Sequence, residues 1–352
     1  MTRVNYSYSA YGLVLASDAC LPGLPQQPDP SATADVLLTV GAQPDWVREA
    51  ERLPSYVELP VRSASEQDDP SLTLTHFGND DFFELSYAEG ARFVVDRAAT
   101  RIWGTWCSPL TIEDAATFLL GPVMGFVLRR RGTTALHASA IRIQGHAVVL
   151  CGESAAGKST TVAALALSGF PVLAEDVSAV QQNADDFYIL PGYPRVCLWP
   201  DSVKALFGSA DALSPLTPTW EKRFLPLDDD RAKFESQRQP LGAIYIFAPR
   251  SNDTLAPHIE PLSQREALLE LVQNTYMNWL LDRSQRAAEL DLLTKIVSSV
   301  PVRRIVAHAD PARLSTFRDL IASDAAALLS SASSAAEGVL SDADRNAAAQ
   351  PA

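Results

Sequence analysis

A run of ten residues, 151–160, combines glycine, lysine and hydroxyl side chains at a spacing that suits the binding of nucleotide phosphates. It reads Cys-Gly-Glu-Ser-Ala-Ala-Gly-Lys-Ser-Thr and contains the pattern G-x-x-x-x-G-K-[ST]. Glycines let backbone N–H groups face the phosphates, while Lys158 supplies charge to the β- and γ-phosphates and Ser159 offers a hydroxyl to Mg²⁺. We therefore predict a site for nucleotide phosphates and Mg²⁺ in residues 152–160, the phosphate loop. Its predicted binding residues are Gly152, Glu153, Ser154, Ala155, Ala156, Gly157, Lys158, Ser159 and Thr160.

The elements that must position this loop can be read on either side of it. The apolar run 146–150 predicts a buried strand, and residues 159–168 carry apolar side chains at helical spacing before Gly169 and Pro171. A further predicted strand at 136–143 is joined to the loop strand by a two-residue turn, which indicates an antiparallel hairpin. An antiparallel neighbour for the loop strand implies a mixed sheet.

His137 lies on the first strand of that hairpin. If Ile143 pairs with His146 across the turn, the ladder sets His137 opposite Gly152. We therefore predict that the hairpin carries an imidazole to the mouth of the phosphate loop. The alternative is a histidine that makes only structural hydrogen bonds at a strand end.

Two adjacent carboxylates, Glu175 and Asp176, follow the next predicted strand at 170–174. Adjacent residues on an extended chain point to opposite faces, so the two acids are expected to divide the work. One would reach the metal, and the other would take a proton from an attacking hydroxyl. The alternative is a solvated turn after a strand.

The order of histidine strand, phosphate loop and acid pair resembles the catalytic core of the HPr kinase/phosphorylase-like serine kinases, over about residues 130–300. The resemblance implies a phosphotransferase that uses ATP and Mg²⁺ to phosphorylate a serine on a protein or peptide acceptor. It further implies that Glu175 is the general base with His137 as its partner. Asp176 and Ser159 would belong to the metal shell.

Three departures from the family pattern stand out. Glu175 occupies a position where the family usually has aspartate, and Ala155 one where the loop often has glycine. No counterpart of the segment associated with phosphorylase activity is present, so reversal of the reaction is not expected. With a β-rich N-terminal part, the chain is similar to relatives found with peptide-modifying gene sets. Some of these resemble kinases of the terminal serine of a lasso-peptide precursor, which makes a ribosomal precursor peptide a candidate acceptor.

Other classes of function remain open at this point. A P-loop ATPase or GTPase switch would hydrolyse nucleotide steadily without an acceptor. A non-catalytic nucleotide-binding adaptor would bind nucleotide without turnover even with its partner present. A kinase of a small-molecule hydroxyl is a variant of the main interpretation.

Three basic segments are further candidates for binding phosphate. Arg195 follows a rigid Pro-Gly-x-Pro segment, and we predict that it contacts phosphate or substrate; the alternative is an arginine stacked on Tyr193 or Trp199. Glu221-Lys222-Arg223 lies in a proline-rich connection expected to be mobile, where a cation would either close over the transferring phosphate or remain a solvated loop charge. Arg residues at 129–131 are more simply explained as complementing the negative end of a helix.

Composition narrows the class of protein. The chain has 352 residues and a net charge of −13 without a concentrated Lys/Arg run, so a nucleic-acid partner is not expected. The longest apolar stretch, 115–128, is too short for a membrane span, and the N-terminus does not read as a signal peptide. Four cysteines lack metal or disulfide spacing, which indicates a cytoplasmic protein. We also expect a homo-oligomer.

These patterns predict an α/β fold, a mixed-sheet P-loop kinase core with a β-rich N-terminal domain. Residues 1–110 are predicted to form the β-rich accessory domain, 111–131 a connecting helix, 132–329 the catalytic domain and 330–352 a mobile tail. The predicted N-terminal strands cover 4–9, 12–16, 35–40, 56–61, 72–76, 82–87, 91–96 and 101–106.

Overall fold

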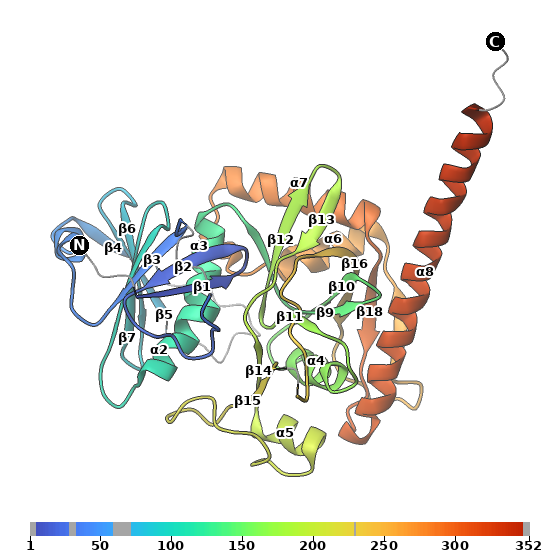
Figure 1. Ribbon diagram of the computed structural model, residues 1–352, viewed down its shortest axis with the longest axis horizontal. Coiled ribbons are helices and arrows are strands. Elements are labelled where there is room, and N and C mark those ends of the chain that lie inside the picture. Colours follow the sequence, from blue (N-terminus) through green and yellow to red (C-terminus); the bar gives the residue numbers. More distant parts are fainter. Residues whose placement is uncertain (1–4, 28–32, 59–71, 229, 348–352) are drawn as a thin grey trace.

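The computed structural model describes residues 5–27, 33–58, 72–228 and 230–347 (Figure 1). Its N-terminal part forms one eight-stranded sheet in the order β1-β2-β3-β8-β7-β6-β5-β4. Strand β3 runs parallel to both its neighbours, and the other pairs are antiparallel. The strands are β1 (Tyr6–Ala10), β2 (Leu13–Ser17), β3 (Val36–Val40), β4 (Ser55–Glu58), β5 (Leu72–Phe77), β6 (Phe82–Tyr87), β7 (Ala91–Asp96) and β8 (Arg101–Trp106), with the short helix α1 (Asp45–Ala50) after β3.

The predicted N-terminal strands all have counterparts in this sheet because their β-branched and aromatic residues alternate between turn residues. The predicted hairpin between β6 and β7 turns at Gly90, whose φ of 107° suits glycine. Predicted strand 56–61 is found as far as Glu58, and its remainder lies outside the described residues.

The single helix expected at 111–131 is divided into α2 (Ile112–Phe118), a π-helix (Leu119–Val123) and α3 (Met124–Arg130). Pro122 lacks the N–H that a regular α-helix requires, and the wider π-turn accommodates it. The predicted cap at Thr111 is present, with Asp114 accepting hydrogen bonds from the N–H and hydroxyl of Thr111.

The second large sheet is mixed, as predicted, with strand order β10-β9-β12-β13-β16-β18-β17. Strand β16 runs parallel to β10 and β18, whereas β9 is antiparallel to β10. Because β10 pairs with both β9 and β16, the strands from β10 to β16 close on themselves. The strands are β9 (Thr134–Ile143), β10 (His146–Cys151), β11 (Val172–Ala174), β12 (Val177–Asn183), β13 (Asp186–Ile189), β16 (Gln239–Phe247), β17 (His258–Pro261) and β18 (Val302–Val306).

Helices cover this sheet on both faces (Figure 1). One hydrophobic core joins the sheet to α4 and α8, and another joins it to α6 and α7. A separate two-stranded ribbon, β14 (Arg195–Leu198) with β15 (Arg223–Pro226), packs beside α4 and α5. The helices are α4 (Lys158–Ala166), α5 (Pro200–Phe207), α6 (Gln264–Gln273), α7 (Arg283–Ser299) and α8 (Leu314–Ala347).

Residues 330–347 of the expected mobile tail continue a helix, and residues 348–352 lie outside the described residues. Helix α8 begins at Leu314 and continues to Ala347, projecting beyond the rest of the molecule in Figure 1. The alanine-rich composition of this segment has high helix propensity. Among the described helices, none is both long and apolar enough to cross a membrane.

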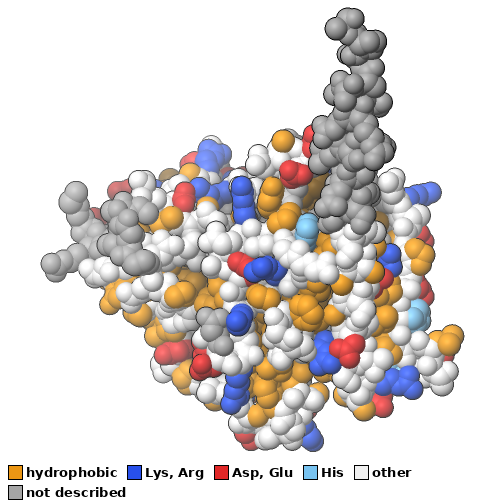
Figure 2. All heavy atoms as spheres, turned by 45° about the vertical axis from the view of Figure 1, so that its right-hand side comes forward, with side chains coloured by type: hydrophobic (Ala, Val, Ile, Leu, Met, Phe, Trp, Pro, Cys, Tyr) orange, Lys and Arg blue, Asp and Glu red, His pale blue; other side chains and the backbone are white. Residues whose placement is uncertain are grey.

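The N-terminal sheet shares a hydrophobic core with the rest of the protein. This core includes both faces of the connecting helices and reaches Ala135 on β9, Val177 and Ala179 on β12, and Tyr193. Arg129 and Arg130 lie in the last turn of α3, as predicted, and Arg129 also forms an ion pair with Glu289 on α7 at 2.5 Å. On the face in Figure 2, basic and acidic side chains are interspersed among apolar ones.

Candidate active site

The phosphate loop connects the end of β10 to the start of α4, as predicted. The hairpin register also matches the prediction, with Ile143 paired to His146. Gly157 caps α4 with a φ of 107°, a conformation that glycine adopts readily. Ala155 adopts a φ of 61°, which accounts for the glycine often expected at this position.

Lys158 is buried and folds back over the loop. Its Nζ donates to the carbonyl of Gly152 at 2.6 Å and to that of Glu153 at 2.9 Å. Burial lowers the pKa of Lys158, and the charge of Asp176 is the largest influence that opposes this. The ammonium group therefore lies at the loop in the neighbourhood of the acid pair, where an anion would be stabilised.

The acid pair follows β11 and divides between two partners. Glu175 is buried, and its Oε1 accepts a hydrogen bond from the Ser159 hydroxyl at 2.6 Å. Asp176 lies 3.1 Å from Nε2 of His137, measured to Oδ1. Glu175 thus contacts the phosphate loop, and Asp176 contacts His137 on β9.

This pairing differs from the one implied by the resemblance, which joined His137 to Glu175 and Ser159 to Asp176; the catalytic and metal-binding roles of the two acids stay predictions. Asp176 has a φ of 67°, so the chain is not extended between the two acids. The following residue, Val177, pairs with His137 across β12 and β9, which brings Asp176 beside the imidazole. Glu175 has the extra methylene that lets its carboxylate reach Ser159.

The two carboxylates differ in their affinity for protons. Burial raises the pKa of Glu175 to about 7, and the charge of Asp176 adds to this effect. Burial also raises the pKa of Asp176. The hydrogen bond and charge of His137, together with the charges of Lys158 and Lys222, outweigh this effect, so the pKa of Asp176 lies below its usual value. Asp176 is therefore the carboxylate that stays ionised beside His137, whereas Glu175 holds a proton more readily.

The side chains at the loop fit a bound Mg²⁺. Ser159 and Glu175 present a hydroxyl and a carboxylate together, the hard oxygen donors that Mg²⁺ prefers. Glu175 also carries a raised pKa because its charge is disfavoured there, and a divalent cation would relieve that cost. Within the described residues no group of three His, Cys, Asp or Glu side chains could hold a metal, so nucleotide oxygens and water would complete the coordination.

Among the described residues Arg195 makes its contacts outside the phosphate loop, so its predicted contact with phosphate or substrate stays a prediction. It is buried, with Nη2 donating to the Thr117 hydroxyl at 3.3 Å and the guanidinium 5.2 Å from the Tyr193 ring centroid. Gly23 in the N-terminal part also packs directly against the guanidinium. The alternative of stacking on Tyr193 is found, but in a buried contact between the N-terminal part and the second sheet.

Arg250 is a site residue that the sequence interpretation missed. A Cβ placed on Gly157 would lie 2.9 Å from its Nη2, so the guanidinium lies over the N-terminus of α4. Within the described part of the chain Arg250 has no carboxylate partner. A cation at the positive end of a helix is unfavourable unless an anion joins it. Its position in the sequence could have indicated this, because Arg250 comes just after β16. Strand β16 is parallel to β10, so the C-terminal ends of the two strands lie side by side.

The N-terminal sheet also reaches the acid pair. The turn between β1 and β2 carries Tyr11, which is buried and donates its hydroxyl to the carbonyl of Leu120 at 3.0 Å. Burial raises the pKa of Tyr11, and the charges of Asp176 and Glu175 raise it further. The turn between β1 and β2 therefore lies close enough to the acid pair for the two charges to act on Tyr11.

Comparison with family models of known proteins gives no match, and comparison with curated proteins gives none either. Among solved structures, one similar chain is the Hpr(Ser) kinase/phosphatase from Coxiella burnetii. The identity is 15%, the match covers 57% of this chain and 95% of that one, and the TM-score is 0.30. This relationship is distant, and the functional argument therefore rests on the geometry of the site.

Proposed function

We propose that the protein is an ATP- and Mg²⁺-dependent kinase that phosphorylates a serine hydroxyl on a protein or peptide acceptor. The observation that carries the proposal is the division of the acid pair at the phosphate loop. The Ser159 hydroxyl donates to Glu175, and Asp176 contacts His137. We assign the first pair to the metal and the second to the acceptor proton, the two tasks that accompany transfer of a phosphoryl group to a hydroxyl.

The residues then take the following roles. The loop amides and Lys158 bind the phosphates of ATP, and Arg250 adds charge at the same helix end. Mg²⁺, when bound, neutralises charge on the β- and γ-phosphates. Asp176 takes the proton of the acceptor hydroxyl, and His137 orients its carboxylate, a function typically worth about 10²–10⁴-fold in rate.

The step balances within these groups. The acceptor oxygen forms a bond to the γ-phosphorus as the bond from that phosphorus to the β,γ-bridging oxygen breaks. The electron pair of the broken bond stays on the departing ADP oxygen, and the acceptor proton moves to Asp176.

The test is incubation of the protein with Mg-ATP and a panel of synthetic serine peptides, including peptides that end in serine. Mass spectrometry should find one added phosphate on a serine, with no product from Lys158→Ala. The matched control Lys204→Ala, on the exposed side of α5, should behave as wild type. Steady ATP hydrolysis at a rate independent of every peptide would favour a nucleotide switch. Nucleotide binding without turnover under all conditions would favour an adaptor.

A further inference from the structure

The segment between α5 and β15 is fastened to the connecting helix α2, although its prolines predicted a mobile connection. Asp114 has no exposed surface and accepts a hydrogen bond from the Thr219 hydroxyl at 2.5 Å. The next residue, Trp220, packs edge-on against Phe118 with ring centroids 5.3 Å apart. A buried carboxylate is costly without such partners, so this anchor is specific.

The anchored segment brings Lys222 to the start of α5, a helix that itself contacts the phosphate loop. The Lys222 carbonyl accepts a hydrogen bond from the Leu216 N–H at 2.8 Å, and its Nζ lies 4.9 Å from the ring centroid of Trp199. Trp199 is the N-cap of α5. The same helix contacts the end of the phosphate loop, where the Ser202 and Thr160 hydroxyls lie 2.8 Å apart.

The charge of Lys222 acts on the acid pair. It lowers the pKa of Glu175 more than the charge of Lys158 does, and it also lowers the pKa of Asp176. In the described parts of the chain no carboxylate forms an ion pair with Lys222. The ammonium group is thus close enough to influence both acids, yet it remains available to another anion.

We propose that Lys222 is a second catalytic cation, which binds the transferring phosphoryl group from the acceptor side, and that Asp114 and Thr219 position it. This inference rests on the proposed function. Lys158 serves the nucleotide phosphates from the loop, whereas Lys222 would donate N–H groups to the oxygens of the phosphoryl group as it leaves ADP. The acceptor proton moves to Asp176, so Lys222 takes part in the transfer only through its N–H donors. The N-terminal part of the chain would thereby complete the catalytic centre.

A transition-state mimic tests this proposal without a known acceptor. Fluorescent MANT-ADP with Mg²⁺ is titrated onto the protein with and without aluminium fluoride, which occupies the place of the transferring phosphoryl group. Wild type should bind more tightly with aluminium fluoride. The added tightening is the ratio of the dissociation constant without aluminium fluoride to that with it. In Lys222→Ala this ratio should fall about 10²-fold, while the affinity for Mg-MANT-ADP alone changes less than about twofold. Lys204→Ala is the matched control and should behave as wild type.

Variants of Thr219 test whether this residue and Asp114 position Lys222. Thr219→Val removes the hydrogen bond to Asp114 and should reduce the added tightening about tenfold, whereas Thr219→Ser should retain it. In the Lys222→Ala background, Thr219→Val should have no further effect, because both changes act through the same ammonium group. A merely structural role for Thr219 would instead lower the melting temperature and leave the added tightening unchanged.

The outcomes separate the two proposals. Failure of wild type to bind MANT-ADP, or to bind it more tightly with aluminium fluoride, would contradict the proposed phosphoryl transfer itself. Added tightening that is equal in wild type and Lys222→Ala would overturn the inference about Lys222 and leave the proposed function intact.

Discussion

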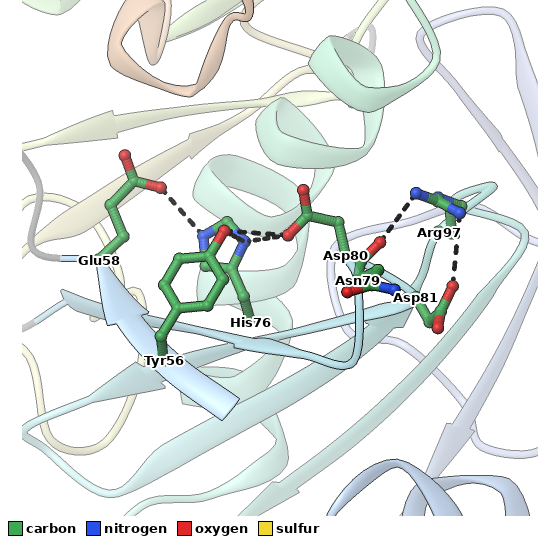
Figure 3. Close-up of polar contacts among 7 residues, drawn as sticks. All are labelled: Tyr56, Glu58, His76, Asn79, Asp80, Asp81 and Arg97. Carbon is green, nitrogen blue, oxygen red and sulfur yellow. Dashed lines mark hydrogen bonds and ion pairs between the residues drawn. The ribbon is translucent and has the colours of Figure 1, made fainter. Parts of the chain in front are cut away.

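Among the described residues His76, His137 and His258 contact carboxylates, and the arrangements at His76 and His137 differ in a way that separates a structural role from a chemical one. In the N-terminal sheet, His76 lies between two acids, with Nε2 2.9 Å from Glu58 and Nδ1 2.8 Å from Asp80 (Figure 3). At the phosphate loop, His137 contacts one carboxylate, that of Asp176. The His76 side chain is 9% exposed and that of His137 is 28% exposed.

The surroundings of His76 account for a structural role. Tyr56 stacks on its ring at 4.3 Å and donates its hydroxyl to Asp80 at 3.0 Å, as Figure 3 shows. Tyr56 and Glu58 belong to the edge strand β4, and His76 belongs to its neighbour β5. The cluster therefore holds the edge strand to the sheet. Saturation of both ring nitrogens leaves His76 no atom with which to act on a substrate, whereas His137 is partly open beside the phosphate loop.

The largest expected effect comes from exchanging equivalent acids for amides at the two histidines. Asp176→Asn should lower phosphoryl transfer about 10²–10⁴-fold, because the proton acceptor is lost, while nucleotide binding is retained. Asp80→Asn, the matched control, should leave transfer unchanged. Peptide phosphorylation and MANT-ADP titration measure the two properties. Equal rates in the two variants would remove the proposed distinction between the histidines.

Replacing the histidines themselves gives the next largest effect. His137→Gln should lower the rate of phosphoryl transfer about 10–100-fold, because glutamine would orient the Asp176 carboxylate less well than the imidazole does. The unfolding free energy should change little. His76→Gln should keep its transfer rate but lose about 1–3 kcal/mol of unfolding free energy, because Glu58 and Asp80 lose a shared partner. Chemical denaturation and transfer assays would show the opposite pattern if the roles were reversed.

The pH dependence of the unfolding free energy tests the raised pKa of Glu175 in the acid pair. The folded-state pKa of Glu175 is about 7, above the ordinary value of 4.5. Between these values the folded protein holds a proton that the unfolded chain releases, so stability falls as pH rises through this window, by about 3 kcal/mol at most.

Glu175→Gln should lack this loss. Its stability relative to wild type should therefore increase between pH 5 and pH 8, in the absence of Mg²⁺. Urea unfolding at both pH values measures the difference. The control Glu221→Gln changes an exposed acid nearby and should follow wild type. A constant difference between Glu175→Gln and wild type would contradict the raised pKa.

The smallest effect is expected from Tyr56→Phe. The substitution removes the hydroxyl that contacts Asp80 and His76 but keeps the stacked ring. Because Tyr56 is half exposed, the unfolding free energy should fall by only about 0.5 kcal/mol, without any change in transfer. A large loss of transfer would indicate that this cluster communicates with the phosphate loop.

The parts of the site that were predictable from sequence are encoded locally. The hairpin register follows from turn length and strand pattern, and the phosphate loop from the spacing of Gly152, Gly157 and Lys158. The mixed sheet follows from the hairpin. Each depends on residues within about twenty positions of one another.

The parts that were not predictable depend on distant or backbone-specific features. The exchange of partners between Glu175 and Asp176 results from a left-handed φ that a non-glycine residue seldom adopts. Arg195 is buried because Gly23 and Thr117, far away in sequence, pack against it. The anchoring of Thr219 by Asp114 likewise joins segments more than a hundred residues apart. No local pattern specifies such contacts.

A crystal structure with Mg²⁺ and a non-hydrolysable ATP analogue would test the central claim most directly. We expect Ser159 and Glu175 at the metal, with Asp176 and His137 facing the γ-phosphate from the side open to an acceptor. A γ-phosphate that lies away from Asp176 and His137, with the metal held by other residues, would contradict the assignment and leave only a nucleotide-binding protein.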